Sequence, residues 1–391
     1  MLGIETIAVG LYADCGSRDE PEGLNGLAHL FEHMVFKGAG GRSAREISEA
    51  IEDVGGDLNA ATDREVTSFQ ASVLAEHLPL AVKLISDLVL RPHFDETELD
   101  REKLVVLQEL AEVRDTPSDI IFDDLQAAAF ADQPIGRSIL GDDDSVEAIT
   151  IENLRAWQAG RYRAGSLILV AAGKVDHAKL VELAERHFAA LKPGRADATP
   201  EAWFTGGDRV GRGGSDQAHL ALGFCGPAQL DETIYAARLF ADVVGGGMSS
   251  RLFQQLREDR GLAYTVFASL YPYRDLGLLA IYAATARSQS AMAAQLIEEI
   301  VATSTTDASQ RELDRVRTQA RAGLLMSMES PWGQAHYVAR QLLLHGRLVE
   351  PREVVAALDA VTVEELREAG RRMLAGPRAR ATIGFPAVRA A

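Results

Sequence analysis

The sequence has little cysteine and no long hydrophobic run. Its two cysteines, Cys15 and Cys225, are too few for a disulfide framework and are compatible with a reducing compartment. No apolar stretch is long enough to span a membrane, and the N-terminal residues do not resemble a secretory signal. These absences disfavour a disulfide-stabilised secreted protein and a membrane protein. We therefore expect a cytoplasmic protein that does not act at a membrane.

The chain is also poor in positive charge. Its formal net charge of −17 disfavours nucleic acids and anionic membrane surfaces as partners. Acidic residues that line a cavity would favour cationic substrates, and a generally acidic surface explains the charge equally well. The 391 residues are 47% hydrophobic and 25% charged, which is ordinary for a globular protein with two or three domains.

The sequence repeats itself at an interval of about 210 residues. Cys15-Gly16 recurs as Cys225-Gly226, and Glu-Leu-Asp-Arg occurs at 98–101 and again at 312–315. The segment AITIENLRAW has a later counterpart in AVTVEELREA. Because these matches keep their order, we predict two homologous domains, 1–195 and 208–391. The segment between them contains Pro, Gly and small polar residues and is predicted to be a linker.

Each half combines strand-like and helical patterns, which predicts an α+β fold. Short apolar runs typical of strands lie at 67–74, 166–175, 277–286 and 378–385. Long amphipathic patterns typical of helices lie at 96–115, 176–191, 287–304 and 311–328. We expect a mostly antiparallel sheet packed with helices in each domain.

The segment HLFEH places His29 and His33 four residues apart, with Glu32 directly before the second histidine. On a helix, the two histidines lie on one face and can bind one metal ion. Two imidazoles suit zinc, and a neighbouring carboxylate suits a base that takes a proton from water. The spacing is that of the H-x-x-E-H zinc peptidases. The alternative is a helix that carries these residues by chance, but the surrounding apolar residues predict a buried helix.

The helix predicted at 96–115 carries two glutamates beside its apolar stripe. Glu102 and Glu109 lie two turns apart on the same side of this helix. A catalytic zinc site needs a third protein ligand, which Glu109 could supply. The alternative is a pair of solvated glutamates at the edge of the stripe.

HLFEH, followed by REKLVVLQELAEVRDTP, resembles the pitrilysin family of zinc peptidases. This family includes insulin-degrading enzyme and the mitochondrial processing peptidase, and the processing-peptidase branch is the most similar. The resemblance covers essentially the whole chain and implies two related domains that form half of a clamshell. It implies that His29, His33 and Glu109 are zinc ligands, that Glu32 is the general base, and that Glu102 is an outer-shell carboxylate.

The second half cannot build the same zinc site. At the interval of the repeat, Gly323 takes the place of Glu109, and RLFADVV takes the place of the histidine motif. We therefore expect one zinc ion per chain. The glycine-rich segment GGGMSSRLFQQLREDRGLAYTV lacks the lysine of a phosphate-binding loop. The resemblance instead implies that Arg257 and Tyr264 bind the substrate backbone and stabilise the oxyanion. The alternative is a helix salt bridge for Arg257 and a core position for Tyr264.

The resemblance also implies how an extended peptide is held. Asn59 and Ala60 mark a strand edge in LNAATDREVTSF, and in the family a strand that follows this edge pairs with substrate. A plain sheet strand is the alternative.

The function implied is a zinc-dependent endopeptidase that cleaves extended peptides inside a closed chamber. A single two-domain chain must obtain the Arg/Tyr pair from a second copy, so we expect a homodimer with shared active sites. Two alternatives stay open at this point. One is a non-catalytic partner or scaffold subunit, since some family members have lost the zinc motif. The other is a zinc hydrolase that acts on a non-peptide amide or ester.

Overall fold

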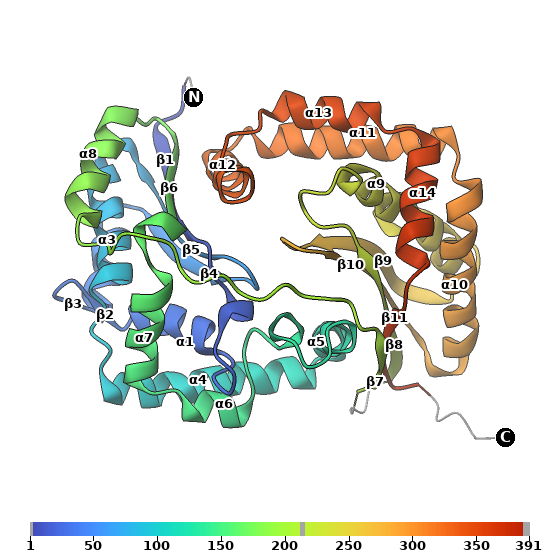
Figure 1. Ribbon diagram of the computed structural model, residues 1–391, viewed down its shortest axis with the longest axis horizontal. Coiled ribbons are helices and arrows are strands. Elements are labelled where there is room, and N and C mark those ends of the chain that lie inside the picture. The colour runs from blue at the N-terminus through green and yellow to red at the C-terminus, as the bar shows by residue number, and fades with distance from the viewer. Residues whose placement is uncertain (1–2, 212–215, 386–391) are drawn as a thin grey trace. The chain divides into compact units, whose positions relative to one another are not determined.

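The computed structural model describes residues 3–211 and 216–385 (Figure 1). The chain divides into two compact units. The first unit comprises Met1–Ala111, Arg137–Pro200 and Leu325–Val349, and the second comprises Glu112–Gly136, Glu201–Leu324 and Glu350–Ala391. Each unit contains one main sheet with helices packed against it, so the fold is α+β with two related halves, as the sequence predicts.

The main sheet of the first unit is antiparallel and has the strand order β4-β5-β1-β6. These strands span Asp57–Thr62 (β4), Thr67–Leu74 (β5), Thr6–Ala13 (β1) and Leu167–Gly173 (β6). Residues of β1 alternate between two cores, because successive side chains of a strand point to opposite faces. Ile7, Val9 and Leu11 belong to the larger core, whereas Ala8 and Tyr12 belong to a smaller one on the other face.

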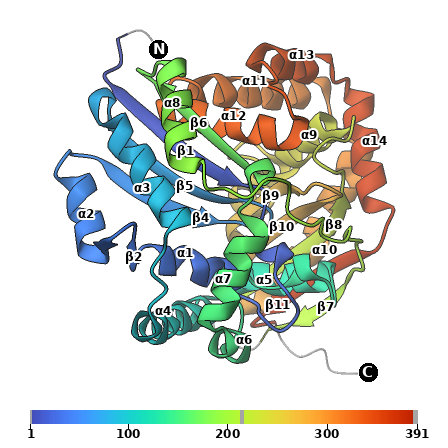
Figure 2. The same cartoon turned by 60° about the vertical axis from the view of Figure 1, so that its left-hand side comes forward.

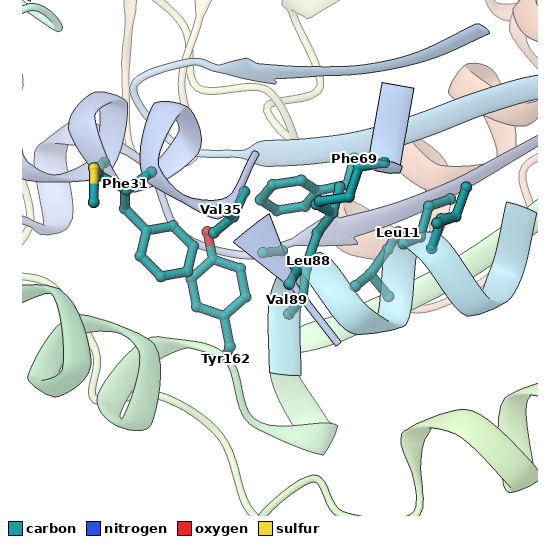
Figure 3. Close-up of a cluster of buried hydrophobic side chains, with 14 of the residues drawn as sticks. Leu11, Phe31, Val35, Phe69, Leu88, Val89 and Tyr162 are labelled. Carbon is teal, nitrogen blue, oxygen red and sulfur yellow. The ribbon is translucent and has the colours of Figure 1, made fainter. Parts of the chain in front are cut away.

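Helices cover both faces of this sheet (Figures 1 and 2). On the side of the larger core lie α1 (Leu27–Val35), α3 (Leu78–Leu90), α7 (Ile151–Arg161) and α8 (His177–Phe188). Figure 3 shows side chains of α1, α3, β1 and β5 meeting in this core, where the ring of Tyr162 lies beside Phe31 at 4.8 Å between centroids. The opposite face is covered by α12 (Pro331–His345), which packs on β1 and β6.

The shorter elements of the first half, and the long helix α4, complete the surroundings of α1. They are β2 (Gly38–Ala39), β3 (Arg42–Ser43), α2 (Ala44–Glu52), α4 (Glu96–Asp115) and α6 (Asp143–Ala148). Leu99 and Val106 of α4 are buried in the same core as α1, which fixes how α4 lies beside that helix.

The main sheet of the second unit has the order β7-β11-β8-β10-β9. Its strands span Gly207–Val210 (β7), Arg378–Ile383 (β11), Gln217–Gly226 (β8), Gly277–Ala286 (β10) and Ala263–Pro272 (β9), and only β7 and β11 pair in parallel. One face packs with α9 (Ile234–Gly245), α10 (Ser290–Asp307), α11 (Gln310–Ser327), α13 (Pro351–Ala360) and α14 (Val363–Leu374). The other face is covered by α5 (Pro117–Ala129).

The repeat seen in the sequence is also present in the topology. The order β4-β5-β1-β6 has its counterpart in β9-β10-β8-β11, and α4 followed by α5 has its counterpart in α11 followed by α12. Each half of the sequence contributes one helix to the other unit. Helix α5 comes from the first half and belongs to the second unit, and α12 comes from the second half and belongs to the first unit. The compact units therefore differ from the linear division into 1–195 and 208–391.

The predicted element positions agree closely with the structure. Helix α4 and strands β5 and β10 have the predicted bounds, and helices predicted at 176–191, 287–304 and 311–328 are α8, α10 and α11, shifted by up to a few residues. In the described ranges no helix is both long and apolar enough to cross a membrane.

Candidate metal centre

Helix α1 carries the histidine motif and is anchored by its apolar face. Leu30, Phe31, Met34 and Val35 of this helix have no exposed surface. Because these residues fix the helix against the core, the side chains of His29 and His33 lie on the opposite face and keep 14% and 20% of their surface exposed. The local sequence thus aims both imidazoles outward.

The start of α1 is held by a buried carboxylate that the sequence reasoning missed. Gly26 precedes the helix with a φ of 86°, and a Cβ there would lie 2.6 Å from the carbonyl oxygen of Leu140. The backbone N–H groups of Gly26 and Ala28 donate to the two carboxylate oxygens of Glu20 at 3.0 and 2.8 Å. Burial raises the pKa of Glu20 to about 8. No local pattern in the sequence indicates this contact, because Glu20 lies six residues before Gly26.

The structure brings His29, His33 and Glu109 together. The Nε2 atoms of His29 and His33 lie 3.9 and 3.8 Å from Oε2 of Glu109, and one ligand atom of each residue lies within 4.8 Å of the other two. The two histidine–carboxylate distances are too long for hydrogen bonds. The three groups therefore converge without bonding one another. Among the described residues, this is the only such cluster of three metal-ligating groups.

This donor set fits zinc. Two imidazoles and one carboxylate form a catalytic zinc set that leaves a position open for water. Burial, followed by the neighbouring His33, lowers the pKa of His29 to about 4, so its imidazole is neutral at pH 7 as a metal ligand must be. Glu109 keeps 39% of its side-chain surface exposed, so the cluster is open on one side.

Glu32 lies on the same helix between the two histidines. Its Oε2 atom is buried and has no hydrogen-bond partner within 3–211 and 216–385. Burial raises the pKa of Glu32, and this rise is opposed by Thr62 at the end of β4 and by His33. An unpaired carboxylate oxygen beside the histidine cluster can accept a proton from a water molecule there.

Glu102 contacts both His33 and Lys37. Glu102 is 5% exposed, and its Oε2 lies 3.1 Å from Nδ1 of His33. The other oxygen, Oε1, lies 2.7 Å from Nζ of Lys37. Glu102 is therefore not a solvated glutamate at the edge of an apolar stripe. Lys37 was not singled out from the sequence, because its partner lies far away along the chain.

Arg257 and Tyr264 lie together in the second unit. Arg257 belongs to a π-helical segment, Phe253–Glu258, and its guanidinium lies 4.8 Å from the ring centroid of Phe253 and 5.4 Å from that of Tyr264. Tyr264 is 73% exposed on β9. Tyr264 is therefore not a core tyrosine, and Arg257 forms no salt bridge with another described residue.

Asn59 and Ala60 lie on β4, one of the two edge strands of the first sheet. The side-chain oxygen of Asn59 accepts a hydrogen bond from the backbone N–H of Ala60 at 2.8 Å. The expectation that a following strand is the one open to substrate is wrong. That strand, β5, is paired on one side with β4 and on the other with β1. The two edge strands of this sheet are β6 and β4, and β4 contains Asn59 and Ala60.

Comparison with known proteins identifies the family. Residues 3–143 match the insulinase model of peptidase family M16, and residues 148–320 match the model of the peptidase M16 inactive domain. An uncharacterized zinc protease of Rickettsia bellii is 34% identical over 382 residues, which cover 97% of this chain and 93% of that protein. The chain belongs to peptidase family M16. An uncharacterized zinc protease of Mycobacterium leprae is 36% identical over 380 residues, covering 95% of this chain and 85% of that protein.

Solved structures agree with the M16 fold. A crystal structure of a protease from Helicobacter pylori has a TM-score of 0.89 at 21% identity and covers 97% of this chain and 94% of its own. A crystal structure of a peptidase M16 inactive domain from Pseudomonas fluorescens has a TM-score of 0.91 at 22% identity and covers 99% of this chain and 94% of its own. At these identities the likeness concerns the fold. The insulinase model covers the residues of the histidine cluster, and the inactive-domain model covers Arg257 and Tyr264.

Proposed function

We propose that this M16 chain is a zinc-dependent endopeptidase that cleaves peptides held in an extended conformation. The observation that carries the proposal is the convergence of His29, His33 and Glu109, with Glu32 on the same helix turn. The Nε2 atoms of both histidines and a carboxylate oxygen of Glu109 would hold one zinc ion per chain. Bound there, zinc would supply a Lewis acid that lowers the pKa of water and polarises a carbonyl.

Glu32 is assigned the role of general base. Its unpaired buried oxygen accepts the proton of the attacking water, and the carboxyl group then returns that proton to the leaving amine. A raised pKa supports this double role, since the protonated form is then easier to reach during turnover. Glu102 keeps the ring of His33 in place through its hydrogen bond to Nδ1.

The peptide is assigned to the free edge of β4. An extended peptide that pairs with this strand is recognised through its backbone, which tolerates many side chains. Thr62 ends β4 and contributes to the surroundings of Glu32, so a peptide on this edge passes beside the base. Asn59 and Ala60 are the strand residues that we assign to this contact.

Arg257 and Tyr264 are assigned to the substrate backbone and the oxyanion. The exposed Tyr264 hydroxyl is a hydrogen-bond donor, and the guanidinium of Arg257 provides positive charge beside it. We propose a homodimer in which this pair from one subunit completes the site of its partner around a closed chamber. The net charge of −17 per chain would favour basic peptides there.

The decisive experiment measures zinc and cleavage together. Purified protein should contain about one zinc per chain by elemental analysis and should cleave members of a peptide library. A chelator should abolish cleavage, and added zinc should restore it. Cleavage that survives complete removal of zinc would refute the proposed mechanism.

A further inference from the structure

Lys37, two residues beyond the end of α1, contacts the carboxylate that supports the metal centre. Its Nζ lies 2.7 Å from Oε1 of Glu102, while Oε2 of the same carboxylate lies 3.1 Å from Nδ1 of His33. Glu102 therefore connects a lysine ammonium on one side with a histidine ring on the other. Both of its oxygens are engaged, and only 6% of its side-chain surface is exposed.

The second half shows what the same positions contain where the described residues form no cluster of metal-ligating groups. Helices α1 and α9 can be aligned through Leu30-Phe31 and Leu239-Phe240, which are equally buried. In this alignment, other residue types stand at the positions of His33 and Lys37. Helices α4 and α11 can be aligned through Glu-Leu-Asp-Arg, and another residue type also stands at the position of Glu102. The replacements are Asp242 for His33, Gly246 for Lys37 and Val316 for Glu102.

The replacement of Glu102 by valine indicates that this is a core position. Val316 and Glu102 are each 5% exposed. A carboxylate in such a place is unfavourable unless it is paired, and a valine needs no partner. The first half carries the carboxylate together with Lys37 and His33, and the second half lacks all three. The three residues are thus present together in the first half and absent together from the aligned positions of the second.

We propose that Lys37 is a positioning residue of the metal centre, which acts on His33 through Glu102. The inference rests on the zinc chemistry proposed above. With Oε1 held by Lys37, the carboxylate cannot turn away, and Oε2 stays on Nδ1 of His33. An imidazole that donates its Nδ1–H in this way presents the lone pair of Nε2 to the ion, in a fixed ring orientation. Without Lys37, the freed carboxylate oxygen would be able to rotate toward the ion or toward water.

The test compares zinc affinity among variants of the full-length chain. Lys37→Met keeps most of the length of the side chain and removes its charge, and Lys37→Arg keeps the charge. The matched control is Lys179→Met on α8, where the lysine pairs with Glu182 on the surface. We expect Lys37→Met to raise the zinc Kd by about 10- to 100-fold in a chelator competition. Lys37→Arg should recover most of the affinity, and Lys179→Met should bind zinc like the wild type.

A double variant separates positioning from stability. Lys37→Met leaves a buried carboxylate without its cation, so the metal-free variant should have a lower Tm. Adding Glu102→Val introduces the valine that the second half contains and should restore the Tm of the metal-free protein. The zinc Kd should nevertheless stay raised, because His33 still lacks its hydrogen-bond partner.

Three outcomes decide the matter. A zinc affinity that returns together with the Tm in the double variant would show that Lys37 acts on stability alone and would overturn the inference. A wild-type zinc Kd for Lys37→Met, in a chain that binds zinc normally, would overturn the inference and leave the proposed function intact. A wild-type chain that binds no zinc would overturn the proposed function, and this inference with it.

Discussion

The two halves of the chain contain the same helix pair but differ in what it carries. Helices α1 and α9 bury corresponding apolar residues, and α4 and α11 follow in the same order. At the remaining aligned positions, the first half has His29, Glu32 and His33, and the second half has Arg238, Ala241 and Asp242. The apolar face that builds the fold is thus independent of the polar face that would perform chemistry. The same helix arrangement therefore accommodates either set of residues.

The largest expected effect comes from removing one histidine of the cluster. His33→Ala should lower the zinc content from about one per chain to near zero and reduce peptide hydrolysis to background, because two remaining ligands do not form a catalytic site. Zinc is measured by elemental analysis, and hydrolysis with a fluorogenic peptide.

The reciprocal variant is the control for this comparison. Asp242→His gives the second half a histidine where the first half has His33. It should leave the zinc content at about one per chain, because Arg238 and Gly323 stand where His29 and Glu109 would be needed. A second equivalent of zinc in this variant would show that the second half is closer to a metal site than we infer.

A smaller effect is expected for the base alone. Glu32→Gln should keep zinc bound, because Glu32 is not a ligand, and should slow hydrolysis by about 10²- to 10⁴-fold, the usual contribution of general base catalysis. The rate and the zinc content are measured on the same preparation. Hydrolysis at the wild-type rate would remove Glu32 from the mechanism.

Mixing two variants tests whether the first half of one subunit works together with the second half of its partner. Tyr264→Phe alone should lower the rate by about 10²- to 10³-fold. Mixing it with Glu32→Gln under conditions of subunit exchange should give heterodimers in which one site has both defects and the other has none. Each heterodimer should then work at about half the wild-type rate. Absence of recovery, with exchange verified by mass tags, would place Tyr264 in the site of its own chain.

The smallest effect concerns Asp242, which stands where the first half has His33. Burial raises the pKa of Asp242 from 3.8 to about 6. The folded state therefore favours the protonated form, and this stabilisation is present below pH 3.8 and is lost as the pH rises through 6. Asp242→Asn cannot ionise, so it should gain free energy of unfolding relative to the wild type over this range, on the order of 1 kcal/mol above pH 6. Urea titrations between pH 4 and pH 8 measure the difference. An equal pH dependence for both proteins would contradict the prediction.

The sequence predicts where helices and strands lie along the chain better than it predicts which of them pack together. Strong periodicity located α4, β5 and β10 at their observed bounds. Periodicity does not tell which strand lies at a sheet edge, however. The sequence therefore does not show that β5 is paired on both sides and that β4 is an edge strand. An apolar helix face likewise does not specify which sheet it covers, which is why the exchange of α5 and α12 could not be foreseen.

The same distinction holds for the candidate site. The histidine pair and Glu32 follow from spacing along one helix, and Glu109 follows from the resemblance to a family. Lys37 and Glu20 could not be found in this way, because each acts through a contact that local spacing does not encode. Lys37 meets Glu102 on another helix, and Glu20 reaches the start of α1 across a loop.

The exchange of α5 and α12 has a consequence for how the chain is made. The face of the first sheet that carries Ala8 and Tyr12 is covered by α12, which follows β6 by more than 150 residues along the chain. During synthesis, this apolar face stays uncovered until the residues of α12 have left the ribosome, long after those of the first sheet. The first half therefore cannot complete its folding as an independent nascent domain. A fragment that ends at the linker would present that face to solvent, so expression of the first half alone should yield an aggregation-prone product.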